Sequence, residues 1–397
     1  MAKTNPTISI ALLSGIGEAK LKDKLTPLKS DLEKSGLWWT RPEEFNPRGL
    51  ALFLRNIFQL PKEVADPLYV IGTLAKNEYE SFVMDEFLDA KIEVPNGNIK
   101  AAMTLWERSP EICASIIVRQ DALRHRKYAY FRPKDKVENQ LKCPTQAEVE
   151  VIRKDLSEWF NSKGKGKYSL VLCHEEEDWI YFSIFHGGSI KHDNDVNSGD
   201  VNPLSYRPEI SDFVRVNKMS GVLGIHLSAR CKLIETHYVE VVRKFFLQKN
   251  KYISRNCYTL EPLKDERKTL IVGDLMDTIS KFRLKEVHLQ FKGQEIRIAG
   301  DNVGKLWVDW KLSQSNFKKA IFEVYFMNDD NPKTLTIIPP NTIDYPERYD
   351  SEDLNELLAE NKFLIEEEVV VEDTAKEDLQ GTLLDFFDVA EPVKMAN

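Results

Sequence analysis

The sequence predicts an α+β protein: a mostly helical N-terminal domain, then an antiparallel-sheet domain with a packed helix, then an acidic flexible tail. Three observations lead to this prediction. Apolar residues recur at three- and four-residue spacing over residues 1–150, short β-prone runs separated by polar turns fill 165–365, and charge dominates 366–397. With 397 residues and a hydrophobic share of 42%, the chain is long enough for two or three domains with real cores.

The helical prediction for residues 1–150 depends on apolar spacing. One face of a helix interrupted at Pro27 is marked by four leucines, Leu21, Leu25, Leu28 and Leu32. The spacing is similar over 76–94 and over 101–123, where Pro110 marks a break. No alternating, β-rich pattern stands out in this part of the chain.

The pattern changes to strands from about residue 167. Residues 167–188 predict two strands joined by an acidic turn, and 212–229 predict a second hairpin that turns near Ser220 and Gly221. A helix is expected over 230–247. Further strands follow, with a tight turn at Lys292 and Gly293, and a short amphipathic helix opens near Ser351.

The charge of the chain is divided unevenly. Residues 351–397 hold 14 acidic and 3 basic side chains, which leaves 49 acidic and 52 basic side chains for the other 350 residues. The overall charge of −8 therefore combines a tail of −11 with a body of +3. A body of this charge tolerates a nucleic-acid partner but does not indicate a strongly basic DNA-binding domain.

Five widely spaced cysteines, none in a CxxC pair, are typical of reduced thiols, so we expect a cytoplasmic protein. No apolar run is long enough for a transmembrane helix, so no membrane partner is expected. The sequence contains neither GxxxxGK[ST] nor GxGxxG, and we expect no cofactor.

One long polar stretch, residues 185–209, is rich in Gly, Asn and Asp. Four of its side chains are candidate nitrogen and oxygen ligands of a metal: His186, His192, Asp193 and Asp195. The alternative is an exposed hairpin connection, because the same residue types favour turns. No spacing here matches an established metal motif.

Basic residues interleaved with aromatic residues suggest contact with nucleic acid. Cations neutralise phosphates, and aromatic rings stack on unpaired bases. The candidate residues are Arg124, Arg126, Lys127, Tyr128, Tyr130, Arg132, Lys163, Lys165 and Lys167. The alternative is that each patch is an ordinary solvated face whose aromatic rings belong to the core.

The acidic tail contains one apolar motif. Gln380, Leu383, Phe386 and Phe387 have the spacing Q-x-x-hydrophobic-x-x-aromatic-aromatic. In one helical turn the last three of these side chains share a side and form an apolar plug. Alternatively, this segment is an amphipathic helix that docks on the protein's own body or on a sister subunit.

The tail motif resembles the PIP box, the peptide through which replication and repair proteins dock on the sliding clamp PCNA. The resemblance covers residues 380–387 and implies that Gln380 hydrogen-bonds into a polar pocket beside the apolar groove. Acidic residues flank the plug, whereas PIP boxes often carry basic flanks. Bacterial β-clamps bind a related, shorter peptide, which this sequence fits less well.

The body, over about 180–265, is similar to uncharacterised bacterial proteins associated with phage defence. This resemblance implies a place in a defence or DNA-maintenance system and names no catalytic residue.

Three functions are compatible with the sequence. The first is a DNA-associated adaptor or sensor subunit that docks on a sliding clamp or another protein through its tail. The second is a metal-dependent nuclease or hydrolase that uses the 186–200 loop. The third is a structural subunit of a protein complex without contact to DNA. No residue pattern identifies a catalytic centre, and we favour a protein that is not an enzyme.

Overall fold

A computed structural model describes residues 8–365, apart from short gaps at 126, 135–136, 177, 198–199, 230, 248–252, 255–256, 265–269, 271–277, 292, 301–302, 304–314, 328, 330 and 346–351. For residues 193–204, 253–254 and 352, the structure does not describe the side chains. The tail from 366 onward, which carries the docking motif, lies outside the described residues.

The α+β class is confirmed. Eight helices form the N-terminal part, as the apolar spacing predicts: α1 (Ile10–Ile16), α2 (Glu18–Leu25), α3 (Lys29–Lys34), α4 (Pro47–Leu54), α5 (Lys62–Leu74), α6 (Glu80–Asp89), α7 (Asn98–Arg108) and α8 (Pro110–Arg124). The leucine face interrupted at Pro27 is also confirmed, since its four leucines are buried and a 3-10 turn separates α2 from α3.

Residues 127–344 supply one large sheet, helices that pack on it, and a separate two-stranded ribbon. The strands of the sheet are β1 (Lys127–Pro133), β2 (Ser169–Glu176), β3 (Trp179–Gly187), β6 (Glu209–Asn217), β7 (Leu223–His226), β8 (Ile253–Ser254), β9 (Ile279–Phe291), β10 (Gln294–Ala299), β11 (Asn316–Phe326), β12 (Lys333–Ile338) and β13 (Thr342–Asp344). Their order is β10-β9-β11-β12-β13-β1-β7-β6-β3-β2, with β8 beside β1. All these pairs are antiparallel.

Strand β1 connects two halves of this sheet. Its residues Lys127 to Ala129 pair with β13, and Ala129 to Phe131 pair with β7. The sequence places this segment in the helical N-terminal part, and the structure differs there. Three β-prone aromatic residues in a run of seven are the local reason why the segment is extended.

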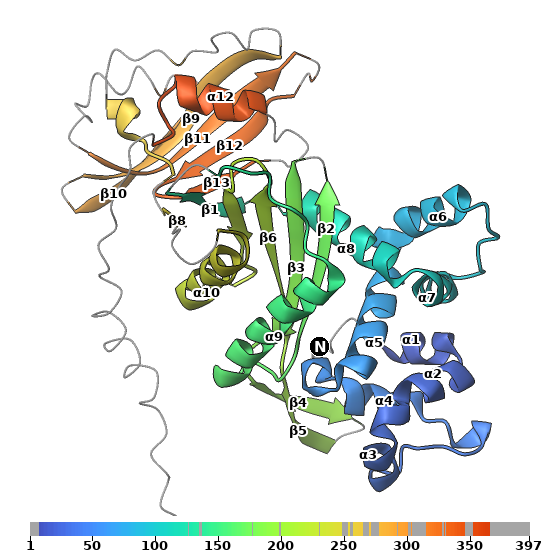
Figure 1. Ribbon diagram of the computed structural model, residues 1–397. Helices are drawn as coiled ribbons and strands as arrows, with labels where there is room; N and C mark the ends of the chain where they lie inside the picture. Colours follow the sequence, from blue (N-terminus) through green and yellow to red (C-terminus); the bar gives the residue numbers. More distant parts are fainter. Residues whose placement is uncertain are drawn as a thin grey trace, which may run out of the picture.

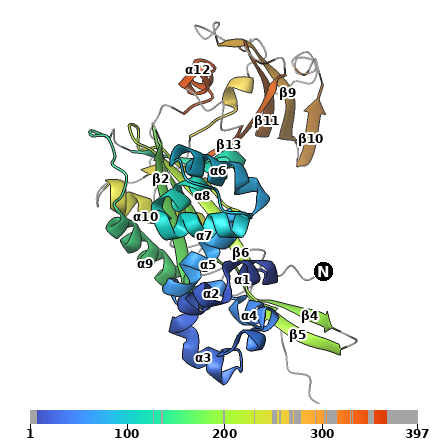
Figure 2. The same cartoon turned by 90° about the vertical axis from the view of Figure 1, so that its right-hand side faces the viewer.

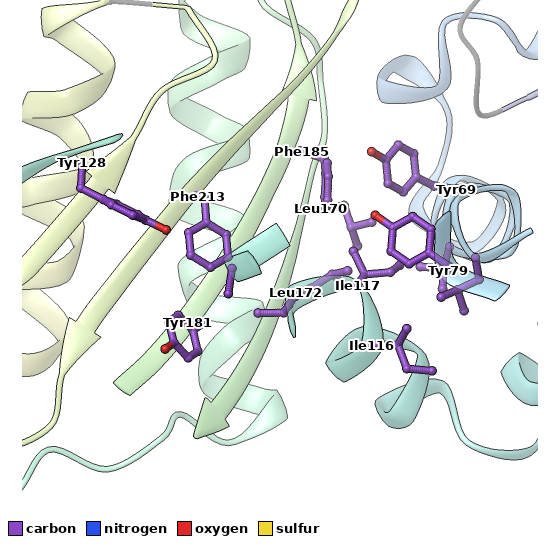
Figure 3. Close-up of a cluster of buried hydrophobic side chains, with 14 of the residues drawn as sticks. Tyr69, Tyr79, Ile116, Ile117, Tyr128, Leu170, Leu172, Tyr181, Phe185 and Phe213 are labelled. Atoms are coloured by element: carbon purple, nitrogen blue, oxygen red, sulfur yellow. The ribbon is translucent and has the colours of Figure 1, made fainter. Parts of the chain in front are cut away.

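The half of the sheet formed by β2, β3, β6 and β7 is covered on both faces. On one face lie α9 (Gln146–Ser162) and α10 (Lys232–Val242), and on the other lie α5 and α8 (Figure 1). Figure 3 shows the second interface, where Tyr69 and Ile117 from the helices face Leu170 and Phe185 of the sheet. Strands β2, β3 and β6 therefore carry apolar side chains on both faces of the sheet, as expected for strands between two layers of helices.

Strands β9 to β12 form the other half, with α12 (Glu352–Glu360) on one face (Figure 2). Phe363, just after α12, packs on Phe322 with ring centroids 5.1 Å apart. The predicted amphipathic helix and the predicted two-residue turn are confirmed, because Leu354 is buried and Phe291 pairs with Gln294 across Gly293.

Buried polar groups join the helical part to the sheet. Ser183 of β3 donates a hydrogen bond to Asp121 of α8 at 2.7 Å, and Tyr69 of α5 donates one to Glu209 of β6. Burial raises the pKa of Asp121 to about 6. Burial lowers the pKa of the neighbouring His125 to about 3, so this imidazole is neutral in the folded protein near neutral pH.

Replacing Phe213 by alanine should lower the free energy of unfolding by about 3–5 kcal/mol, because its side chain is fully buried between α8, β1 and β3. Urea unfolding measures this change. The matched control is Leu123→Ala on α8, whose side chain is 54% exposed and whose loss should change stability by about 0.5 kcal/mol or less. Equal effects of the two changes would contradict the described core.

Asp121 should make stability depend on pH. Burial raises the pKa of its carboxyl group from an ordinary value of 3.8 to about 6, so the folded state holds the proton more tightly. This stabilisation is complete below about pH 4 and is lost as the pH rises through 6, a change on the order of 3 kcal/mol. The unfolding free energy of the wild type minus that of Asp121→Asn should therefore fall between pH 4 and 7. A flat or rising difference would contradict the burial of this carboxyl group.

Candidate nucleic-acid interface

The predicted basic and aromatic residues around β1 divide into surface and core. Arg124, at the end of α8, is exposed and forms an ion pair with Glu78 at 2.9 Å. Lys127 and Arg132 lie part-buried on β1, and Arg126 lies outside the described residues. Arg124 therefore already has a carboxylate partner within the chain.

Tyr128 and Tyr130 cannot stack on nucleic-acid bases as proposed from the sequence, because they are 1% and 4% exposed. Both rings point to the face of β1 where Arg215 lies. The Arg215 guanidinium stands 4.1 Å from the Tyr128 centroid and 5.3 Å from the Tyr130 centroid. These aromatic residues belong to the core, as the alternative interpretation states.

The three lysines Lys163, Lys165 and Lys167 lie on the connection from α9 to β2. Gly164 and Gly166 have positive φ angles, 65° and 125°, which let this short connection turn. Its end is fixed by the backbone, since the Lys167 amide donates to the Phe58 carbonyl oxygen at 3.0 Å. Lys163 and Lys167 are exposed.

A groove of about 530 Å³ borders this connection. Most of its lining residues are of polar or charged type: Lys62, Glu150, Val151, Arg153, Lys154, Ser157, Glu158, Asn161, Lys167 and Tyr168. Arg153 is committed to Asp66 through two hydrogen bonds of 2.6 and 2.9 Å, and Lys62 pairs with Glu150 at 3.0 Å. Most of the positive charge of the groove is therefore compensated within the protein.

The proposed metal ligands lie in different environments. His186 is fully buried on β3, where Nε2 lies 3.1 Å from an Asp212 carboxylate oxygen and the ring stacks on Phe160. His192 lies exposed on β4 (Lys191–Asn197), with Nδ1 2.8 Å from the Ser205 hydroxyl on β5 (Asp200–Tyr206). Asp193 and Asp195 are also on β4, but their side chains are not described.

Among the described residues, no group of three or more His, Cys, Asp or Glu side chains is arranged to hold a metal ion. The long polar stretch instead forms a two-stranded ribbon, β4 and β5, in agreement with the hairpin interpretation. Its first histidine is part of the core, because Tyr238 and the Ser228 backbone amide also hydrogen-bond to Asp212 and complete a buried network.

Strands β9, β10 and β11 form a cationic surface that was not among the predictions from the sequence. Opposite the face that packs on α12, strands β9, β10 and β11 carry five cationic and three acidic side chains, here called the β9–β11 face: Lys281, Arg283, Lys285, Arg297, Lys319, Glu286, Glu295 and Glu323. The side chains of Lys285 and Arg297 remain 53% and 66% exposed. The face therefore has a surplus of two positive charges and is open to solvent at these positions.

Ion pairs order the side chains of the β9–β11 face. Glu323 accepts hydrogen bonds from Arg283 at 2.7 Å and from Lys285 at 2.6 Å. Arg297 donates to Glu286 through two hydrogen bonds of 2.8 and 2.7 Å. These hydrogen bonds lower the pKa of both carboxyl groups to about 2, so both carboxylates stay ionised at neutral pH.

One aromatic ring lies within this charged face. Tyr325 donates a hydrogen bond to Glu323 at 2.9 Å, and the Lys281 ammonium lies 5.3 Å from its ring centroid. A signal for this face is present in the sequence, because Lys281, Arg283 and Lys285 recur every second residue in a strand. These three residues form no contiguous basic run, since Phe282 and Leu284 stand between them.

The two lysine-bearing surfaces lie at opposite ends of the molecule. The β4–β5 ribbon is at one end and strands β9 to β11 are at the other in both views (Figures 1 and 2). The connection 163–167 belongs to the first end, since its neighbour Arg207, which follows β5, donates a hydrogen bond to the Gly164 carbonyl oxygen. The lysines of the 163–167 connection and the β9–β11 face therefore cannot form one continuous surface.

No family model matches the chain, and no curated protein matches it significantly. Within the described residues, no helix combines the length and the apolar character needed to cross a membrane.

Reversing two charges of the β9–β11 face should weaken binding of single-stranded DNA by roughly tenfold or more, since phosphate contacts dominate such affinities. The variant is Lys281→Glu with Lys319→Glu, which leaves the ion pairs of Glu286 and Glu323 intact. The measurement is fluorescence anisotropy with a labelled oligonucleotide at low salt. The control variant, Lys34→Glu with Lys100→Glu on α3 and α7, changes the charge equally and should bind like the wild type. Equal losses in both variants would show a general charge effect and contradict a specific face.

Proposed function

We propose that the protein is a DNA-associated adaptor that docks on a sliding clamp, or on another protein with a similar groove, through Gln380, Leu383, Phe386 and Phe387. The observation that carries this proposal is the spacing of these four residues within residues 351–397, a segment of net charge −11. An acidic tail gains nothing from a bulky apolar plug unless the plug is buried somewhere. A groove on a partner supplies that burial.

The physical basis is helix-in-groove recognition. One helical turn brings Leu383, Phe386 and Phe387 to one side, and two phenylalanine side chains bury a large apolar area for few rotatable bonds. Gln380 stands one further turn before Leu383 and is available for a polar contact at the rim. Acidic flanks would weaken docking on an acidic surface, which favours a groove with a basic rim.

The body supports this proposal in a second way. Its β9–β11 face carries a surplus of cations with one aromatic ring, a combination suited to the backbone and bases of unpaired DNA. A protein that holds DNA with one surface and a clamp with its tail brings other factors to the clamp. The surplus of two charges points to weak, salt-sensitive contact with DNA that the clamp interaction reinforces.

The nuclease alternative has less support from the geometry. It relied on His186 together with residues of the 186–200 loop, whereas His186 is fully buried and hydrogen-bonded to Asp212. The third alternative, a complex subunit without DNA contact, predicts the same tail docking but no binding of DNA by the β9–β11 face. The two binding measurements therefore separate it from the proposal.

A labelled peptide spanning residues 376–392 should bind PCNA or a bacterial β-clamp, with micromolar affinity typical of single-motif docking, about −8 kcal/mol. Changing Phe386 and Phe387 to alanine should weaken binding by at least about tenfold, because the two rings make up most of the plug. Fluorescence anisotropy measures both constants.

For PCNA, the matched control peptide carries Leu384→Ala, which removes a neighbouring apolar side chain outside the PIP-box spacing. It should leave the affinity within about threefold of the original peptide's, a change in binding free energy below about 1 kcal/mol. Absence of binding to both clamps would end the clamp proposal. An equal loss for Leu384→Ala would indicate nonspecific apolar adhesion instead of a spaced motif.

A further inference from the structure

Two of the five cysteines meet in space although 29 residues separate them along the chain. Cys143 precedes α9 by three residues, and Cys173 lies on β2, at the edge of the sheet. Their sulfur atoms are 3.6 Å apart, both thiols are free, and both residues are partly exposed. Cys113 and Cys257 are buried, and Cys231 is partly exposed.

The surroundings make the two thiols unequal. A hydrogen bond joins the two sulfur atoms, and it lowers the pKa of Cys143 and raises that of Cys173. The Lys218 ammonium also lowers the pKa of Cys143. The Glu175 carboxylate raises it, and this carboxylate forms an ion pair with Lys218 at 3.0 Å. Cys143 is therefore the better nucleophile, and Cys173 is the thiol that keeps its proton.

We propose that Cys143 and Cys173 form an oxidisable dithiol that closes to a disulfide when a peroxide reaches it. The Cys143 sulfur attacks one peroxide oxygen, the O–O bond breaks, and a sulfenic acid and one water form. Cys173 then attacks the Cys143 sulfur, the S–O bond breaks, and a second water leaves. Two thiols and one hydrogen peroxide thus give one disulfide and two waters.

The position of the pair allows this closure. The sulfur atoms need to approach by about 1.5 Å to reach bonding distance, which small side-chain rotations supply. Backbone contacts already hold the segment before α9 in place. The Leu141 amide donates to the Lys218 carbonyl oxygen at 2.8 Å, and the Thr145 hydroxyl caps α9 in a reciprocal bond with Glu148. Closure would join the start of α9 to the edge strand.

A disulfide between Cys143 and Cys173 would fix α9, which borders the groove described above, and would stabilise the fold. Glu150, Arg153 and Ser157 line this groove from α9, whose N-terminal end would be covalently held to β2 in the oxidised protein. A closed loop of about thirty residues restricts the unfolded chain and stabilises the fold. The oxidised protein should therefore unfold at a higher temperature than the reduced protein.

The test is titration of the purified, reduced full-length chain with hydrogen peroxide, followed by peptide mapping without reductant. We expect one linked peptide pair containing Cys143 and Cys173, with the loss of two hydrogen atoms, at peroxide levels that leave Cys113 and Cys257 unmodified. The control Cys231→Ser should form the same linked pair. No linked pair, or pairs that involve the cysteines indiscriminately, would overturn the proposal.

Two single variants test the order of the steps. In Cys173→Ser, a dimedone probe added with peroxide should label Cys143, because its sulfenic acid has no second thiol to attack it. In Cys143→Ser, the same treatment should leave Cys173 largely unlabelled. Equal labelling in the two variants, or labelling of Cys173 alone, would overturn the assignment of Cys143 as the attacking thiol.

Discussion

The pairing of β1 between β7 and β13 is the interaction on which the architecture depends. Seven residues near position 130 supply backbone hydrogen bonds to strands that lie about one hundred and two hundred residues further along the chain. Each buried amide and carbonyl group of β1 needs such a partner, so β7 and β13 are held on either side. One half of the sheet carries α9 and α10, and the other half carries α12. Strand β1 joins them, because its backbone pairs with β7 of the first half and with β13 of the second. Because β1 directly follows α8, the same strand also fixes the helical part against the sheet.

Arg215 completes this junction from β6. It is fully buried, with its guanidinium over Tyr128 and over Trp179 at 4.1 and 4.4 Å and a hydrogen bond of 2.9 Å to the Tyr345 hydroxyl. A buried cation is tolerated where aromatic faces and hydroxyl oxygens replace water around it. Gly224 leaves room for its side chain, since a Cβ atom there would lie 3.0 Å from the Arg215 Cγ. Residues from β1, β3, β6 and β7 and the segment after β13 thus converge on one charge.

Much of the fold could be predicted from local patterns, because helical spacing and hairpin turns depend on neighbours in sequence. The leucine face interrupted at Pro27, the turn at Gly293 and the burial of Leu354 follow from such patterns. Strand β1 and the role of Tyr128 could not be predicted in this way, since both depend on partners far along the chain. His186 shows the same limit: in sequence it adjoins a polar loop, whereas in space Asp212 and Phe160 enclose it. The β9–β11 face was missed for another reason, because a cation at every second residue becomes a surface only once the strand is paired.

We propose that one chain contacts DNA through its body and a clamp through its tail. Hydrogen–deuterium exchange of the full-length chain, alone and with clamp and single-stranded DNA together, tests both contacts in one measurement. We expect new protection at residues 380–387 and over the β9–β11 face, with β1 unchanged. Protection confined to other surfaces, or none at 380–387, would contradict it.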